Sequence, residues 1–229
     1  MRLCDNTKRK THSTYKVLIA LSARFNIRTV DPCVVDVLER TLGVPHIVAA
    51  TLVARGIESP QEAREFLNPS LERDWRNPYD IPGMAEVADG LEAAIRDGKR
   101  ILVFGDFDVD GVSATTVLTR GLRALGATAI PFIPRRTDEG YGITQAAIDR
   151  FMVEEPDVVV TVDCGIACRD EVRTLKHRGV GVFITDHHEP ADLVPEGVPV
   201  CDPKLDPDCP SSILAGVGVA LKLVQVLGA

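Results

Sequence analysis

The chain has 229 residues, a formal net charge of −7, 45% hydrophobic residues and six cysteines. It is long enough for one large domain or two small ones, and too rich in apolar residues for a mostly disordered protein. No apolar run reaches the roughly 20 residues of a membrane-spanning helix, and the cysteines show neither zinc-site spacing nor a small disulfide scaffold. We therefore expect a cytoplasmic globular protein with reduced cysteines, in which any phosphate-bearing substrate is bound by a local feature rather than by overall charge.

Helical patterns fill the first hundred residues. We expect helices at residues 32–42, 45–55, 59–67 and 85–97. The third begins at a capping box that runs from Ser59 to Glu62, with proline at its first helical position. Residues 1–28 fit no element that we can place, so we treat them as an N-terminal extension, followed by a helical region with a linker at residues 29–84.

After residue 100, short apolar segments alternate with helical ones. The apolar segments are rich in β-branched residues and lie at residues 101–104, 129–133, 158–162, 180–184 and 198–200. Helical patterns lie between most of them, at 113–125, 144–153 and 168–177, and a buried helix is expected at 213–228. This order predicts an α/β fold with a doubly wound, mostly parallel sheet, in a domain that covers residues 85–229.

Acidic and imidazole side chains follow several of the predicted strands. They are Asp106, Asp108 and Asp110 after the first strand, Asp163 after the third, Asp186, His187 and His188 after the fourth, and Asp202 after the fifth. Ligands bind at the carboxyl ends of the strands in such sheets. Carboxylates that converge without cations would repel one another, whereas two divalent ions would hold them ionised. Carboxylate oxygens with imidazole nitrogens suit Mn²⁺ or Mg²⁺, so the pattern indicates metal-assisted hydrolysis of a phosphate ester or anhydride.

Each part of this pattern also has an interpretation that needs no shared catalytic site. The run Asp-x-Asp-x-Asp-Gly resembles the start of a calcium loop, but Val117 stands where that loop needs a glutamate, at its position twelve. Asp163 alone could simply end a strand, and His187 and His188 alone could be surface histidines. Their recurrence at three strand ends favours a shared site.

Two glycine-containing segments could contact a phosphate. Arg135 and Arg136, followed by Gly140, Tyr141 and Gly142, form a basic loop after the second strand, where the tyrosine ring offers a stacking surface. The segment from Gly216 to Gly218 starts a helix, and its N–H groups could bind phosphate; close helix packing explains these glycines equally well.

The chain resembles the DHH phosphoesterase superfamily. Its first three motifs correspond to Gly-Asp-Phe-Asp-Val-Asp-Gly at residues 105–111, Thr-Val-Asp-Cys-Gly-Ile at 161–166 and Thr-Asp-His-His at 185–188. Other stretches resemble the RecJ branch of single-strand-specific 5′→3′ DNA exonucleases. They are Arg-Gly-Ile at 55–57 with Phe-Leu-Asn-Pro at 66–69, Glu-Gly-Tyr-Gly at 139–142, and Leu-Ala-Gly-Val-Gly-Val-Ala at 214–220.

The resemblance implies a role for each matching residue. The metal ligands would be Asp106, Asp108, Asp110, Asp163 and His187, holding two Mn²⁺ or Mg²⁺ ions. In catalysis Asp163 would bridge the ions, His188 would face the substrate phosphate, and Asp186 would orient the histidines. Contacts with the DNA strand would come from Arg135, Arg136, Gly140, Tyr141, Gly142, Gly216 and Gly218.

The resemblance also implies a cellular setting. It indicates a cytoplasmic enzyme of DNA repair and recombination that degrades single-stranded DNA and has no membrane association. A single-stranded-DNA-binding protein and a helicase are further partners that it implies, and the full-length enzyme would be a monomer.

The chain departs from the family in ways that leave alternatives open. The family's fourth-motif aspartate lies farther along than Ala229, so we expect a truncated domain and little or no hydrolysis from these residues alone. Asp202 stands where the family often has asparagine, and we do not count it among the ligands. One alternative is a DHH phosphodiesterase of short oligonucleotides or cyclic dinucleotides, which would lack the helical N-terminal region and the Gly-Tyr-Gly loop. Another is an inactive remnant.

Overall fold

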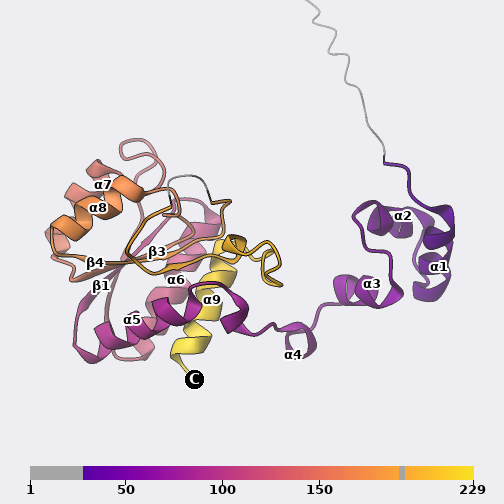
Figure 1. The fold of residues 1–229 in the computed structure, drawn as a ribbon, viewed down its shortest axis with the longest axis horizontal. Coiled ribbons are helices and arrows are strands. Elements are labelled where there is room, and N and C mark those ends of the chain that lie inside the picture. Colours follow the sequence, from indigo (N-terminus) through magenta and orange to yellow (C-terminus); the bar gives the residue numbers. More distant parts are fainter. Residues whose placement is uncertain (1–27, 191–193) are drawn as a thin grey trace, which may run out of the picture. The chain divides into compact units, whose positions relative to one another are not determined.

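The computed structural model describes residues 28–190 and 194–229, so the extension expected at residues 1–28 lies outside it except for its last residue. The chain forms two compact units, one that ends at Asp74 and one from Trp75 to Ala229 (Figure 1). Within the described ranges, no helix is both long enough and apolar enough to cross a membrane.

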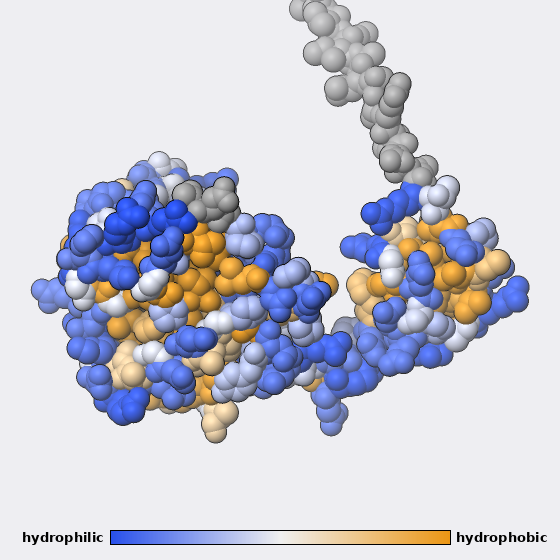
Figure 2. Space-filling model, viewed as in Figure 1, coloured by the Kyte–Doolittle hydropathy of each residue, from blue (hydrophilic) through white to orange (hydrophobic). Residues whose placement is uncertain are grey.

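The first unit consists of helices α1 (Pro32–Leu42), α2 (His46–Ala54), α3 (Pro60–Leu67) and α4 (Leu71–Asp74). The N-cap half of the expected capping box is present, because the backbone N–H of Glu62 donates to the Ser59 hydroxyl. The Glu62 carboxylate accepts from that hydroxyl rather than from the Ser59 backbone N–H. The small core of this unit leaves hydrophobic side chains exposed, including Ile47, Phe66 and Leu71, and Figure 2 shows hydrophobic surface on the face in view.

The second unit is built on a parallel sheet. Its strands are β1 (Arg100–Gly105), β2 (Thr128–Phe132), β3 (Val158–Val162), β4 (Gly181–Thr185) and β5 (Val200–Cys201), in the spatial order β2-β1-β3-β4-β5. The expected α/β fold with a doubly wound parallel sheet is confirmed. The strand order reverses between β1 and β3, and this switch point is where sheets of this kind bind ligands.

Helices cover both faces of the sheet. Helices α5 (Met84–Arg96), α6 (Val109–Ala124) and α9 (Gly216–Leu227) pack on one face, against residues such as Ile101 and Val103. Helices α7 (Gln145–Phe151) and α8 (Arg169–His177) pack on the other, against Leu102 and Phe104 (Figure 1). Because both faces are buried, alternate residues of each strand enter different cores, and the strands are apolar nearly throughout. Short 3₁₀ turns complete the unit: η1 (Pro78–Asp80), η2 (Met152–Glu154) and η3 (Pro203–Leu205).

The largest difference from the sequence prediction is the start of α6. The helix was expected from residue 113, but it begins at Val109, since the Asp108 side chain accepts the backbone N–H of Gly111 as an N-cap. Acidic residues are favourable at a helix N-terminus, where backbone N–H groups lack partners. Asp110 therefore lies in the first helical turn rather than in a loop. Helix α9, expected from residue 213, begins at Gly216.

Candidate functional site

The acidic side chains predicted for the site gather at the carboxyl edge of the sheet. Gly105 of β1 pairs with Val162 of β3, so the residues that follow them, Asp106 and Asp163, are neighbours at the switch point. The loop after β4 brings His187 to the same place, where its Nε2 lies 3.0 Å from Asp163 Oδ1 and 3.5 Å from Asp110 Oδ2.

Two groups of possible metal ligands share Asp163. Its carboxylate belongs to one group with Asp106 and Asp108, and to another with His187 and His188. In each group the ligand atoms lie within 4.8 Å of one another. A single carboxylate common to two groups has the position that a residue bridging two ions would need.

The buried carboxylates at this edge have few protein partners. Asp106 and Asp163 are only 3% and 2% exposed. Oδ1 of Asp106 accepts no hydrogen bond from residues 28–190 or 194–229, and the partner of Asp163 Oδ1 is the His187 ring, at 3.0 Å. Burial raises the pKa of both carboxyls, and the neighbouring Asp108 raises that of Asp106 further while Asp110 does the same to Asp163. A divalent cation would give these oxygens a partner and offset the repulsion between the carboxylates, so the residues present fit such an ion.

The backbone around Asp163 is strained and tightly packed. Asp163 has φ +62°, in the left-handed region that few non-glycine residues occupy. A Cβ placed on Gly216 would lie 2.5 Å from Asp163 Oδ1, so only glycine allows α9 to approach this carboxylate. Gly111 has the same function at Asp106, whose backbone oxygen would be 2.4 Å from an added Cβ. Strain and close packing concentrated at one point are typical of functional sites.

Asp186 is directed at the backbone and at a histidine ring rather than at the carboxylates. Its Oδ1 accepts hydrogen bonds from the backbone N–H groups of His187 at 2.7 Å and His188 at 3.3 Å, and it lies 2.7 Å from the Nδ1 of His188. Its Oδ2 accepts the N–H of Ile166 at 3.0 Å. The orientation of both histidines therefore depends on one buried carboxylate. Contact with the Asp163 carboxylate raises the pKa of His187.

The backbone N–H groups at the start of α9 already have hydrogen-bond partners within the protein. The N–H groups of Gly216 and Val217 each donate to the Asp110 carboxylate at 2.8 Å. They are therefore not free to bind phosphate, and the structure favours the second interpretation of these glycines, close packing. Gly218 is packed in the same way, since an added Cβ would be 3.1 Å from Leu214. Sequence reasoning missed this use of Asp110, because nothing local links residues that are 106 positions apart.

The basic loop after β2 reaches the site through two of its side chains. The Arg136 guanidinium lies 5.1 Å from the centre of the Phe107 ring, and Tyr141 places its hydroxyl 3.4 Å from His188 Nε2. Gly140 and Gly142, on either side of the tyrosine, have φ +78° and +73°, which explains the need for glycine at both. Arg135 takes part through its backbone N–H, which donates to the Glu139 carboxylate at 2.6 Å.

A hollow of about 380 Å³ lies beside the histidines. It is bounded by the loop that carries Tyr141, by the loop after β3 and by Asp186 and His188. Apolar groups such as Ile143 and Ile166 form much of its wall. Its position next to the carboxylate cluster would allow part of a substrate to enter while a phosphate lies at the cluster.

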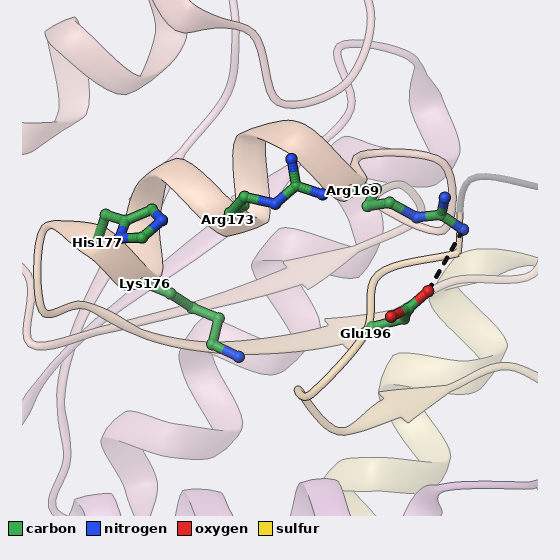
Figure 3. Close-up of a pocket in the computed structure, with 5 residues that line it drawn as sticks. All are labelled: Arg169, Arg173, Lys176, His177 and Glu196. Atoms are coloured by element: carbon green, nitrogen blue, oxygen red, sulfur yellow. Dashed lines mark ion pairs between the residues drawn. The ribbon is translucent and has the colours of Figure 1, made fainter.

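A second hollow, of about 320 Å³, lies along α8 and is lined by none of the predicted site residues. Figure 3 shows Arg169, Arg173 and His177 along the helix, with Glu196 forming an ion pair with Arg169 at 3.8 Å. Lys176 donates to the Gly197 carbonyl at 2.8 Å. The cations of this hollow are thus largely paired within the protein, and we place no substrate contact there.

Asp202 is a buried carboxylate that the sequence prediction set aside. It is fully buried beside Asp186, because Cys201 pairs with Thr185 and each aspartate follows its strand directly. Its Oδ2 has no hydrogen-bond partner among the described residues, and burial raises its pKa to about 6. Nothing in the sequence near residue 202 signals this burial except the short strand before it.

Comparison with known proteins gives a consistent picture. Residues 100–229 match the family described as "DHH family, N-terminal domain". The single-stranded-DNA-specific exonuclease RecJ of Bacillus subtilis is 37% identical over 212 residues, which cover 92% of this chain and 27% of that protein. RecJ of Thermus thermophilus is 46% identical over 194 residues, covering 82% of this chain and 29% of that protein. The chain thus spans less than a third of the length of these two relatives.

Solved structures agree with the sequence relatives. The crystal structure of Thermus thermophilus RecJ in complex with Mn²⁺ superposes with a TM-score of 0.66 at 36% identity, covering 87% of this chain and 28% of that one. A structure of exonuclease RecJ bound to manganese gives a TM-score of 0.59 at 45% identity, covering 64% of this chain and 37% of that one. The resemblance to RecJ proteins found in the sequence is confirmed.

Proposed function

Because the chain belongs to the DHH family, we propose that its second unit carries the metal-binding part of an exonuclease that hydrolyses single-stranded DNA from the 5′ end. The observation that supports this most directly is the pair of ligand groups that share Asp163 at the switch point of the sheet. The similarity to RecJ proteins along most of the chain supports the substrate.

The proposed metal ligands are Asp106, Asp108, Asp110, Asp163 and His187, which would hold two Mn²⁺ or Mg²⁺ ions. The unpartnered Oδ1 of Asp106 and the buried Asp163 carboxylate, which meets only the His187 ring among the described residues, support this assignment, since buried carboxylates need positive partners to remain ionised. When bound, such ions supply Lewis-acid stabilisation of a phosphodiester and a more acidic water.

In this proposal, residues of the chain orient the substrate and take part in proton transfer. Asp186 holds Nδ1 of His188, which leaves Nε2 as the ring nitrogen available to a phosphate oxygen or a leaving group. The Tyr141 hydroxyl lies within 3.4 Å of that nitrogen and could donate to the same phosphate. We assign Asp163 and His188 as catalytic residues and Asp186 as the residue that fixes the histidine.

Contacts with the DNA strand would come mainly from the loop after β2. Arg135 and Arg136 are exposed and could neutralise phosphates, and the Tyr141 ring is 56% exposed and could stack on a base or sugar. Gly140 and Gly142 would give the loop its shape. Gly216 and Gly218 would act by allowing close approach of α9, and a direct contact with DNA stays a prediction for both.

The alternative substrate class is a short oligonucleotide or cyclic dinucleotide. The helical first unit and the Gly-Tyr-Gly loop favour the longer strand, because relatives described as single-stranded-DNA-specific match the chain from its helical region onward. A role in DNA repair and recombination in the cytoplasm, a single-stranded-DNA-binding protein and a helicase as partners, and a monomeric state remain proposals.

Metal binding and hydrolysis test this function separately. We expect a chelator-treated chain to bind Mn²⁺ at two sites in isothermal titration calorimetry, and Asp163→Asn to weaken both. Hydrolysis is measured with Mn²⁺ on a 5′-phosphorylated single strand, a duplex and a dinucleotide, with Asp163→Asn as the inactive control. Slow, metal-dependent shortening of the single strand supports the proposal, cleavage of the dinucleotide alone favours the alternative, and failure to bind Mn²⁺ contradicts the site.

A further inference from the structure

We propose that Glu139 and Arg150 are positioning residues whose ion pair, with its carboxylate buried, holds the loop of residues 133–142 so that Tyr141 faces His188. The proposed effect on substrate binding rests on the function proposed above, whereas the effect on the loop is a property of the structure itself.

Glu139 connects both ends of the loop to α7. Its side chain is 6% exposed, and its Oε2 accepts the backbone N–H of Arg135 at 2.6 Å and a guanidinium N–H of Arg150 at 2.8 Å. The Nε of Arg150 donates to the other oxygen, Oε1. The contact is therefore bidentate, the geometry in which an arginine and a carboxylate fix each other most firmly.

Arg150 extends this connection to the sheet. The same guanidinium donates to the Ile133 carbonyl at 2.8 Å and lies 3.9 Å from the centre of the Phe132 ring, at the end of β2. One side chain of α7 thus contacts the last residue of the strand, the first residue of the loop and the carboxylate near the loop's end. The loop has no helix or strand of its own; its backbone forms one turn, in which the N–H groups of Asp138 and Glu139 donate to the Arg135 carbonyl, and these two hydrogen bonds do not tie the loop to α7.

Tyr141 depends on this anchor because it has few others. It lies between two glycines in the left-handed region and is 56% exposed. Its ring meets the rings of Phe107 and His188 only edge-on, with centroids 6.4 Å and 6.1 Å away. Glu139 is two residues before it in the chain, so the ion pair fixes the position of the backbone that leads into the tyrosine. The paired Arg150 lowers the pKa of Glu139, so the carboxylate stays charged and bound at neutral pH.

The variant Glu139→Gln tests whether the ion pair holds the loop in place. Glutamine keeps the shape but loses the charge-assisted pair, and it avoids the unpaired buried carboxylate that removing Arg150 would leave. Arg135 and Arg136 are exposed trypsin sites inside the loop. We expect limited trypsin digestion to cut there about ten times faster in the variant than in the wild type. Cutting at the wild-type rate would overturn the inference.

Asp149→Asn is the matched control. It removes an ion pair from the same helix, since Asp149 contacts Arg178 at 3.3 Å, but that pair is exposed and does not touch the loop. Digestion at Arg135 and Arg136 should be unchanged in this variant. Circular dichroism melting of both variants shows whether they remain folded, and Arg150→Lys, which keeps the charge but not the bidentate contact, should resemble Glu139→Gln.

A double-variant cycle tests how the ion pair acts on substrate. Binding of a 3′-fluorescein oligothymidylate is followed by anisotropy with Ca²⁺ in place of Mn²⁺. Glu139→Gln and Tyr141→Ala should each weaken binding about tenfold, and the double variant should be no weaker than Tyr141→Ala alone. Mn²⁺ affinity should not change in Glu139→Gln. Additive losses, or loss of Mn²⁺ affinity, would show that Glu139 does not act through Tyr141 and would overturn the inference.

Failure of the proposed function would look different. If the wild-type chain binds Mn²⁺ but no oligonucleotide, the proposed substrate is wrong, and the trypsin comparison still decides whether the ion pair holds the loop.

Discussion

At the amino edge of the sheet, helices return to strands through turns that contain Gly98, Gly126 and Gly179, each with positive φ. An added Cβ at any of these would meet nothing within 4 Å, so glycine is needed only for its backbone conformation. At the carboxyl edge, Gly111 and Gly216 are needed for proximity, because atoms of Asp106 and Asp163 occupy the space where a Cβ would be. Glycines at the amino edge allow the chain to turn, whereas glycines at the carboxyl edge allow separate chain segments to pack closely.

The two edges also differ in the partners of their carboxylates. At the amino edge, the exposed Asp157 accepts the backbone N–H of Arg100 at 2.8 Å and lies near Lys99. At the carboxyl edge, Asp106 Oδ1 has no partner among the described residues, and Asp163 Oδ1 meets the His187 ring but no lysine or arginine. Buried carboxylates without a full set of cationic partners destabilise a fold, so their presence at this edge marks where a ligand would contribute to the structure.

The largest effect is expected from Asp163→Asn. Replacing the carboxylate shared by both ligand groups should lower Mn²⁺ affinity by about 100-fold, because the amide lacks the negative charge that both groups would offer a cation. Calorimetric titration of the chelator-treated chain measures this. Asp157→Asn, at the opposite edge, should leave the affinity unchanged, and an equal loss in both variants would contradict the distinction between the edges.

Gly216→Ala should disturb the fold and the site together. The new methyl group would lie 2.5 Å from Asp163 Oδ1 and within 2.7 Å of two carbons of the same side chain, so α9 or the loop after β3 must move. We expect a loss of about 3 kcal/mol in the free energy of unfolding and weaker Mn²⁺ binding. Urea denaturation and calorimetry check the two effects. An unchanged affinity would show that the approach of α9 does not shape the site.

The sheet could be predicted because its determinants are local. The run Val158–Val162 is β-branched throughout and apolar except for Thr161, which identifies a strand buried on both faces. The convergence of Asp106, Asp163 and His187 followed from a topological rule, since parallel strands share one ligand-binding edge. The start of α6 was wrong by four residues because aspartates that resemble ligands also serve as helix caps, and Asp108 is a cap.

Other features of the site depend on tertiary contacts that no local pattern encodes. Asp110 binds the N-terminus of α9, and Arg150 reaches from α7 to Glu139 and to the end of β2. Asp110, Glu139 and Arg150 are residue types that are common on protein surfaces, and only the fold places them against these partners. The glycines of α9 illustrate the same limit, because free N–H groups and close packing have the same sequence pattern.

Asp202→Asn should stabilise the chelator-treated protein at neutral pH. The pKa of Asp202 is raised to about 6 by burial, so the folded state favours the neutral acid. The stability that the neutral form contributes is present below the ordinary pKa of about 4 and lost as pH rises through about 6. Asparagine mimics the neutral form at every pH, so the variant should gain up to about 3 kcal/mol at pH 7 and only about 0.5 kcal/mol at pH 4. Urea denaturation across this range checks the difference, and equal stability of both proteins at pH 7 would contradict it.

The smallest effect is expected from Gly126→Ala at the amino edge. Space is available for the methyl group, so the only cost is that of a left-handed conformation in a residue with a side chain, about 1 kcal/mol. Mn²⁺ affinity should match the wild type, because the turn lies at the opposite end of the strands from Asp163. Urea denaturation and calorimetry, carried out beside Gly216→Ala, give both quantities. A loss of Mn²⁺ affinity in Gly126→Ala would mean that the edges are coupled through the sheet, and the separation of a conformational edge from a functional one would then be wrong.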